Sequence, residues 1–180
     1  MTRREVIKTV LDGKKPPYTP WSFKFTVEAK NLLVNHFGTD DLDTVLHNHI
    51  LTLGADTGFF DQIGDNLFRD VFGAVWDRSI DKDIGNITGS IIAESTLKGY
   101  SFPDPADKRF FEDIEPSITS HPDMFRLYEI GFSLYERAWT LRGIENLLMD
   151  LMVNPEFVHA LFETIADYNI AQLRQASGYD

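Results

Sequence analysis

Apolar residues recur at helical spacing near the beginning of the chain. In residues 2–11 they form one stripe, made of Val6, Ile7, Val10 and Leu11. Thr2 and Glu5 have the spacing of a capping box, in which each side chain bonds the backbone N–H of the other residue. The pattern predicts an amphipathic helix over residues 2–11 that ends before Gly13.

The same periodicity returns in the middle of the chain and fills most of its last third. The further helices that it predicts are residues 27–37, 40–47, 106–115, 134–142, 144–153 and 155–175. The last of these has a clear start, because Asn154 suits the N-cap and Pro155 suits the first helical position. We therefore expect a chain that is mainly helical after residue 134.

Strand patterns lie between these helices. Trp21–Phe25 alternates apolar and polar side chains, which predicts a first strand. Further strands are predicted at residues 51–60 (with a turn), 69–77, 86–93 and 125–132, and 86–93 is the expected β partner of 69–77. Strands that alternate with helices favour an α/β fold.

The composition excludes several classes of function. The chain has 180 residues, enough for one domain, and a formal net charge of −11. An acidic chain without a basic block attracts neither nucleic acid nor an anionic membrane, so neither is an expected partner. The absence of cysteine excludes disulfides, thiolate zinc sites and a cysteine nucleophile from these residues. No apolar run is long enough to span a bilayer and no secretory signal follows Met1, so we expect a cytoplasmic protein.

No short motif identifies an activity by itself. The chain contains neither GxGxxG nor GxxxxGKS/T, the loops that hold phosphates. His47 and His49 would share one face of a strand but diverge on a helix, and without a third ligand no metal site is predicted. Asp61, Asp65 and Asp70 follow an apolar run, where a carboxylate serves either acid–base chemistry or turn formation.

Two charged residues begin a predicted helix directly after a predicted buried strand. They are Glu136 and Arg137. In a parallel α/β protein this strand-to-helix turn lies at the catalytic face, whereas the alternative for this pair is an ion pair on the surface.

Three stretches together resemble one enzyme family. The first is a short helix followed by a lead into a tryptophan, Pro16-Pro17-Tyr18-Thr19-Pro20-Trp21. The second combines Phe72-Gly73-Ala74-Val75-Trp76 with Gly99-Tyr100-Ser101-Phe102-Pro103-Asp104-Pro105. The third and most specific is Ile130-Gly131-Phe132-Ser133-Leu134-Tyr135-Glu136-Arg137-Ala138-Trp139-Thr140-Leu141-Arg142-Gly143. They resemble the N-terminal half of the uroporphyrinogen decarboxylase family, and the second stretch is similar to its decarboxylase-like relatives in anaerobic bacteria.

The resemblance implies a fold. Members of this family are single (β/α)8 barrels, so it implies an α/β fold of the TIM-barrel family. Such a barrel needs at least about 200 residues, so we expect this chain to be the N-terminal part of one barrel domain, with the C-terminal half absent. Residues 1–20 would supply a helix and lead-in, and residues 21–180 the first three or four barrel strands, their helices and an inserted β-hairpin.

The resemblance also implies residues at the barrel mouth. For substrate binding these are Trp21, Phe23, Lys24, Ser133, Glu136, Arg137 and Trp139. The candidates for the catalytic aspartate are Asp61, in the segment Phe59-Phe60-Asp61-Gln62-Ile63, and Asp65. The decarboxylases of the family bind substrate carboxylates with an R-Q-A-G-R segment, where this chain has Phe23-Lys24-Phe25-Thr26-Val27. Trp139 stands where the family has a pocket tyrosine.

These departures favour the methyltransferase branch of the superfamily, which moves methyl groups between corrinoid proteins and thiols or other acceptors. The expected partner is then a small molecule or a corrinoid protein. That branch implies a corrinoid and a zinc ion bound in the C-terminal half, and no cofactor is evident in these residues. One alternative is decarboxylation of a tetrapyrrole, with Asp61 or Asp65 stabilising a protonated pyrrole. The other is a non-catalytic half-barrel that forms a homodimer or binds a partner, because an open sheet has unpaired edges.

Overall fold

A computed structural model describes residues 1–55 and 58–179 of the chain. It contains helices and two small sheets, which confirms the predicted mixed α/β class. The chain forms two compact units. Unit 1 consists of Met1–Gly54 and Glu112–Glu129, and unit 2 contains the described residues of Ala55–Phe111 and Ile130–Asp180.

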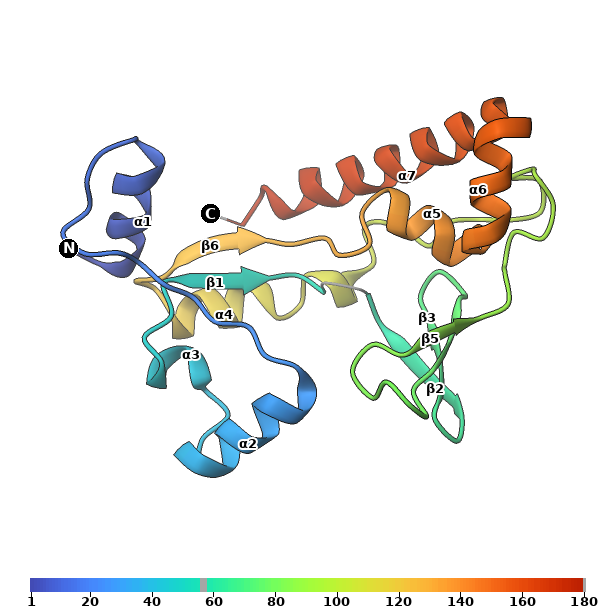
Figure 1. The fold of residues 1–180 in the computed structure, drawn as a ribbon. Helices are drawn as coiled ribbons and strands as arrows, with labels where there is room; N and C mark the ends of the chain where they lie inside the picture. The colour runs from blue at the N-terminus through green and yellow to red at the C-terminus, as the bar shows by residue number, and fades with distance from the viewer. Residues whose placement is uncertain (56–57, 180) are drawn as a thin grey trace. The chain divides into compact units, whose positions relative to one another are not determined.

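Unit 1 is built around two parallel strands (Figure 1). Strand β1 (Ile50–Leu53) pairs with β6 (Phe125–Tyr128) in a register that sets Ile50 opposite Phe125. The helices of this unit are α1 (Arg3–Leu11), α2 (Val27–Phe37), α3 (Leu42–Val45) and α4 (Ile114–Ser120). Helix α1 packs against β6 and α4 packs against β1. Between β1 and α4 the chain passes through the other unit, and α4 then leads directly into β6, the parallel partner of β1.

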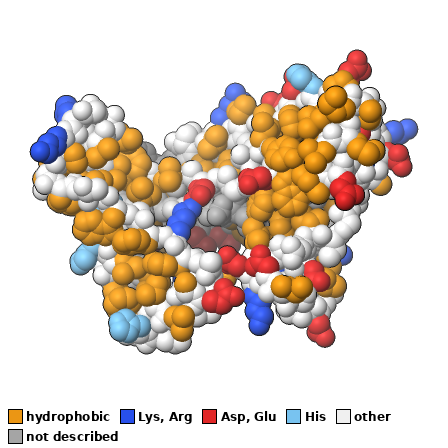
Figure 2. Space-filling view, viewed as in Figure 1, with side chains coloured by type: hydrophobic (Ala, Val, Ile, Leu, Met, Phe, Trp, Pro, Cys, Tyr) orange, Lys and Arg blue, Asp and Glu red, His pale blue; other side chains and the backbone are white. Residues whose placement is uncertain are grey.

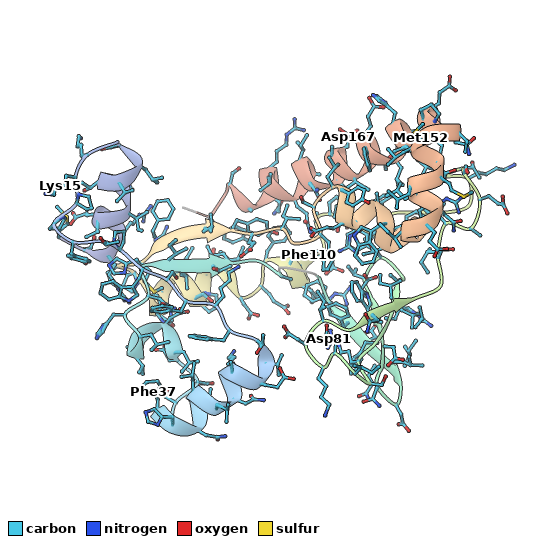
Figure 3. All side chains as sticks on the ribbon, in the orientation of Figure 1. Lys15, Phe37, Asp81, Phe110, Met152 and Asp167 are labelled. Atoms are coloured by element: carbon cyan, nitrogen blue, oxygen red, sulfur yellow. The ribbon has the colours of Figure 1, made fainter. Side chains whose placement is uncertain are left out.

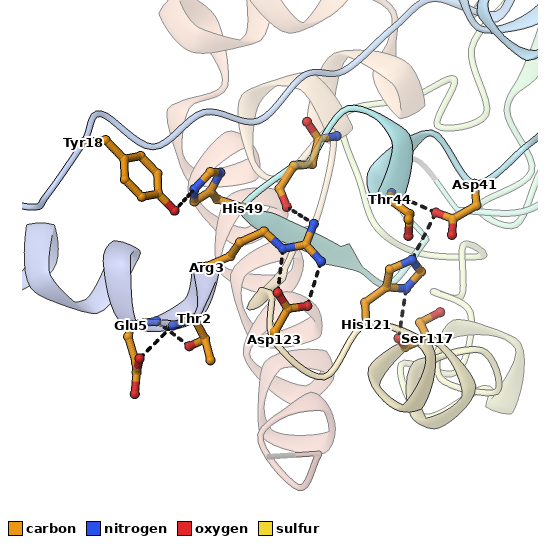
Figure 4. Close-up of polar contacts among 11 residues, drawn as sticks. Thr2, Arg3, Glu5, Tyr18, Asp41, Thr44, His49, Ser117, His121 and Asp123 are labelled. Carbon is orange, nitrogen blue, oxygen red and sulfur yellow. Dashed lines mark hydrogen bonds and ion pairs between the residues drawn. The ribbon is translucent and has the colours of Figure 1, made fainter. Parts of the chain in front are cut away.

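Local signals position the first helix. The Thr2 hydroxyl accepts from the Glu5 N–H at 3.2 Å, and the Glu5 carboxylate accepts from the Thr2 N–H at 2.7 Å (Figure 4). This is the predicted capping box, and it fixes the start of α1. Val6 is the residue of the stripe that becomes fully buried.

Unit 2 combines an antiparallel sheet with three consecutive helices. The strands are β2 (Phe60–Gly64), β3 (Leu67–Asp70), β4 (Val75–Asp77) and β5 (Asn86–Thr88), paired in chain order, so β2 and β5 are the sheet edges. After a 3-10 turn, η1 (Lys108–Phe110), come α5 (Tyr135–Arg142), α6 (Ile144–Val153) and α7 (Pro155–Ala176). The core of the helical part includes Leu141, Leu147, Leu161 and Ile165.

Helix α6 has apolar side chains on its exposed side as well as on its buried side. Leu148, Met149, Met152 and Val153 are all exposed. Figure 2 shows hydrophobic side chains gathered over this part of the molecule, and Figure 3 shows Met152 at its surface. An exposed apolar helix face favours association. This face agrees with the predicted homodimer, which stays a prediction.

Most predicted helices are confirmed, and the strands differ more. Trp21–Phe25 is extended but is not a strand, because its backbone bonds side chains and the chain before β1 rather than a neighbouring ladder. The predicted strand 69–77 is two strands joined by a turn at Val71–Ala74, in which Gly73 has φ +93°. The predicted strand 125–132 ends at Tyr128. The predicted pairing of 86–93 is confirmed for β5.

Two further predictions are wrong in their boundaries or extent. The helix predicted at 106–115 is replaced by η1 and by α4, which continues through Pro116 because a proline in the first turn lacks only an N–H that has no helical partner there. The predicted inserted hairpin is a sheet of four strands. The described residues contain two parallel strands rather than the three or four that were predicted. Neither the sheet of β1 and β6 nor the four-stranded sheet closes into a barrel.

Candidate functional site

The two parallel strands of unit 1 end at a common edge. Beyond the last strand residues the pairing continues, since the Glu129 N–H donates to the Leu53 carbonyl at 3.0 Å. In parallel α/β folds, ligands bind at the carboxyl ends of the strands, where the connecting loops meet. The carboxyl edge of β1 and β6 is therefore the candidate functional site of this unit.

Gly54 follows β1 at this edge and must be a glycine. Its φ is +87°, a conformation that side chains rarely adopt. A Cβ there would also lie 2.7 Å from Cε2 of Tyr128, the last residue of β6. The strand ends are thus closed on one side by the Tyr128 ring, whose half-burial raises the pKa of its hydroxyl.

One ion pair lies at the edge. The Lys24 ammonium bonds the Glu129 carboxylate, and the two side chains are 61% and 31% exposed. Pairs as exposed as this contribute about 0–1 kcal/mol to stability. Sequence reasoning selected Lys24 and missed Glu129, because the predicted strand 125–132 placed Glu129 inside it, whereas β6 ends at Tyr128.

The extended segment that carries Lys24 is attached by buried polar groups. The Phe23 N–H donates to Asn48 Oδ1 at 3.0 Å, and Asn48 Nδ2 donates to Asp43 at 2.7 Å. The Trp21 carbonyl accepts from the His49 N–H at 2.9 Å and from His49 Nδ1 at 3.0 Å. Asn48 and His49 are both buried just before β1, so they fix the segment beside that strand.

Three other contacts complete the support of this segment. His49 Nε2 and the Tyr18 hydroxyl are hydrogen-bonded at 3.1 Å (Figure 4). Arg3 forms a two-pronged pair with Asp123, at 2.7 and 2.8 Å, and donates to the Asn48 carbonyl at 2.9 Å. Arg3 thereby links α1 to the residues that precede β1 and β6.

Aromatic rings on the same segment are exposed. Phe23 is 51% exposed, and its ring stacks on that of Phe25 with centroids 6.4 Å apart and planes at 25°. Trp21 is also exposed, while its Nε1–H donates to the Leu46 carbonyl at 2.9 Å. The predicted residues Trp21, Phe23 and Lys24 therefore share one short exposed segment.

The two candidate catalytic aspartates lie in the antiparallel sheet of unit 2. Asp61 is an exposed residue of β2, opposite Arg69 in the register. Asp65 is exposed in the two-residue turn between β2 and β3. The resemblance implied a carboxylate after an apolar barrel strand, and an antiparallel hairpin is a different setting.

Arg137 is deeply buried, with a structural partner. Its Nη1 donates to Asp70 Oδ2 at 3.0 Å, and its guanidinium carbon lies 3.7 Å from the centroid of the Phe72 ring. Burial lowers the pKa of Arg137, against the opposing effect of the Asp70 charge. The alternative interpretation of Glu136 and Arg137 as a surface ion pair does not hold, because Arg137 turns inward and pairs with Asp70, 67 positions away.

The remaining predicted residues occupy separate places in unit 2. Ser133 is exposed, and its carbonyl accepts from Asn169 Nδ2 at 2.6 Å. Glu136 is exposed in the first turn of α5. Trp139 is half-buried and lines an open cavity near the start of α6.

The described residues offer no set of ligands for the zinc ion that the resemblance implies. No group of three or more His, Asp or Glu side chains in this part of the chain is arranged to hold a metal. His47 is exposed with φ +53°, whereas His49 is buried and bonded to Tyr18 and Trp21. No chemical step is therefore assigned to zinc in these residues.

Comparisons with family models, with curated proteins and with solved structures found no match. Among the residues placed by the structure, no helix combines the length and the apolar composition that a bilayer crossing requires.

Proposed function

We propose that the β1–α4–β6 unit is part of a barrel of the uroporphyrinogen decarboxylase superfamily, and that the protein transfers methyl groups with a corrinoid protein or a small acceptor. The observation that carries the proposal is the carboxyl edge of β1 and β6. There Lys24, on the segment whose Phe23 and Phe25 rings are exposed, pairs with Glu129, which directly follows β6. The resemblance of residues 130–143 to the family supports it independently.

The chemistry of this edge suits a large, mostly uncharged ligand surface. Exposed aromatic rings offer flat apolar area against which a macrocycle can pack. A substrate with many carboxylates needs several cations, yet the Lys24 charge at this edge is already balanced by Glu129. This balance favours methyl transfer over decarboxylation of a tetrapyrrole with acidic side chains.

A barrel also requires more chain. Because a closed (β/α)8 barrel needs at least about 200 residues, the proposal requires a native polypeptide longer than 180 residues. Intact mass spectrometry of the natural protein tests this directly. A mass above 20.6 kDa agrees with the barrel, and a mass of 20.6 kDa would favour a self-pairing half-barrel instead.

The activity is tested with the native protein, methylcobalamin as methyl donor and a small thiol as acceptor. Thiolate attack on the methyl group gives a methyl thioether and leaves the cobalt centre with the bonding electron pair, a change that visible absorbance records. We expect protein-dependent demethylation that falls about tenfold or more in Lys24→Met and in Glu129→Gln, because both would misplace groups at the strand edge. Lys14→Met is the matched control, since Lys14 pairs with Asp12 in an exposed contact at 3.1 Å.

The alternative activity, decarboxylation, is tested with uroporphyrinogen as the substrate. Release of carbon dioxide from uroporphyrinogen without demethylation of methylcobalamin would replace methyl transfer by decarboxylation. Absence of both activities in a protein of 20.6 kDa would refute an enzymatic function and favour the half-barrel that binds a partner.

A further inference from the structure

Unit 2 contains an open cavity of about 650 Å³. It lies between β5, the loop that follows it, and the first turn of α6. Strand β5 is an edge of its sheet. No further strand of the described chain pairs with its outer side. The volume is within the range of about 300–1,000 Å³ that small-molecule sites have.

One wall of this cavity is aromatic. Trp139 is half-buried, packs against the helical core and lines the cavity. The Phe132 ring supports the indole edge-on, with centroids 6.2 Å apart and planes at 76°. Phe132 itself has φ +50°, an unusual conformation for an aromatic residue, and its ring also packs on Trp76 at 5.4 Å. The indole therefore offers the cavity an aromatic surface on which a flat ring can stack.

Uncharged polar groups surround the indole. Asn146 Nδ2 donates to the Arg142 carbonyl at 3.2 Å, which fixes the amide plane and leaves its Oδ1 as an acceptor at the cavity. The side chains of Asn86 and Ser90 also line the cavity, and neither is hydrogen-bonded to another side chain or backbone group within the described chain. These groups supply both donors and acceptors.

The charge at the cavity selects against anions. Glu145 is the charged residue among its lining side chains, and no lysine or arginine lines it in the described chain. The net charge of −11 adds to this selection. We propose that this cavity binds an uncharged planar heterocycle whose edge carries both hydrogen-bond donors and acceptors, stacked on Trp139 and bonded through Asn86, Ser90 and Asn146. This inference does not depend on the function proposed above.

Unphosphorylated nucleosides are the probes, because they have such rings and no charge. Adenosine, guanosine, cytidine and uridine are titrated into the native protein by calorimetry, with AMP as the charged counterpart of adenosine. We expect saturable binding of at least one nucleoside below about 1 mM, and weaker binding of AMP than of adenosine. Trp139→Leu should weaken the binding about tenfold or more, as the loss of a stacking surface does.

Three variants separate the site from general effects. Trp21→Leu removes an exposed tryptophan of unit 1 and should leave nucleoside affinity unchanged. Glu145→Gln should strengthen AMP binding and leave adenosine binding unchanged. Asn86→Ala changes an exposed residue, so it tests the same site if Trp139→Leu fails to fold. The inference is overturned if no nucleoside binds up to about 1 mM, or if bound nucleoside is unaffected by Trp139→Leu and by Asn86→Ala.

Discussion

Replacement of Asp70 by asparagine tests how unit 2 is held together. Asp70 is the last residue of β3, and its side chain is fully buried. One oxygen accepts from the N–H groups of Phe72 and Ala74 at 3.0 and 2.9 Å. The other accepts from Trp76 Nε1 at 3.1 Å and from Arg137 at 3.0 Å. The carboxylate thus shapes the β3–β4 turn and also neutralises a buried guanidinium.

The magnitude follows from the burial of both partners. The side chains of Asp70 and Arg137 are 0% and 3% exposed, so neither charge regains water when the other is removed. Breaking a buried ion pair on one side costs about 3–5 kcal/mol. Asparagine keeps the size of the side chain but removes the charge, and its amide presents a donor where the carboxylate accepted two. We expect Asp70→Asn to lower the free energy of unfolding by about 3 kcal/mol or more.

Urea unfolding, followed by tryptophan fluorescence, measures this loss. With a slope of about 2 kcal/mol per molar urea, a loss of about 3 kcal/mol lowers the midpoint by about 1.5 M. Asp107→Asn is the matched control, because Asp107 pairs with Arg109 at 2.7 Å at the surface, where water screens the two charges. The double variant Asp70→Asn/Arg137→Met should recover part of the loss. Equal midpoints for Asp70→Asn and Asp107→Asn, at an unchanged slope, would refute the reasoning.

Two further changes test unit 1. Gly54→Ala should lower the melting temperature more than Gly13→Ala does, because both glycines have positive φ but only a Cβ at Gly54 would meet the Tyr128 ring; equal shifts in a thermal scan would contradict this. The hydrogen bonds from Arg3 lower the pKa of Asp123, so the stability that Asp123 contributes is complete above its unfolded pKa of about 4 and is lost as the pH falls through the lower folded value. Arg3→Gln should flatten that part of the acid unfolding curve, and an unchanged curve would contradict the assignment.

Helices were predictable from sequence because their signals are local. The capping box of Thr2 and Glu5 and the start of α7 at Pro155 each depend on residues within one turn. Strands were harder to predict, because alternation of apolar and polar side chains does not indicate which groups form hydrogen bonds with the backbone. The run around Gly73 looked continuous, yet Asp70 bonds two N–H groups there and folds it into a turn. Trp21–Phe25 alternates as a strand does, but its partner is the Asn48 side chain.

The candidate site was predictable only in part. Trp21, Phe23 and Lys24 were named from the family resemblance, and their role in binding stays a prediction. Glu129 was missed because its importance comes from its contact with Lys24, across 105 positions of sequence. The same limit applies to Arg137, whose partner Asp70 cannot be inferred from its neighbours in the chain.

The way in which the site segment is attached has a consequence for its dynamics. A strand inside a ladder opens only when several backbone bonds break together, whereas this segment is held mainly by bonds that involve the side chains of Asn48, His49 and Ser22. Segments with few cooperative bonds and exposed side chains open at low free energy. The β1/β6 ladder can therefore stay intact while Phe23 and Lys24 move to admit a ligand.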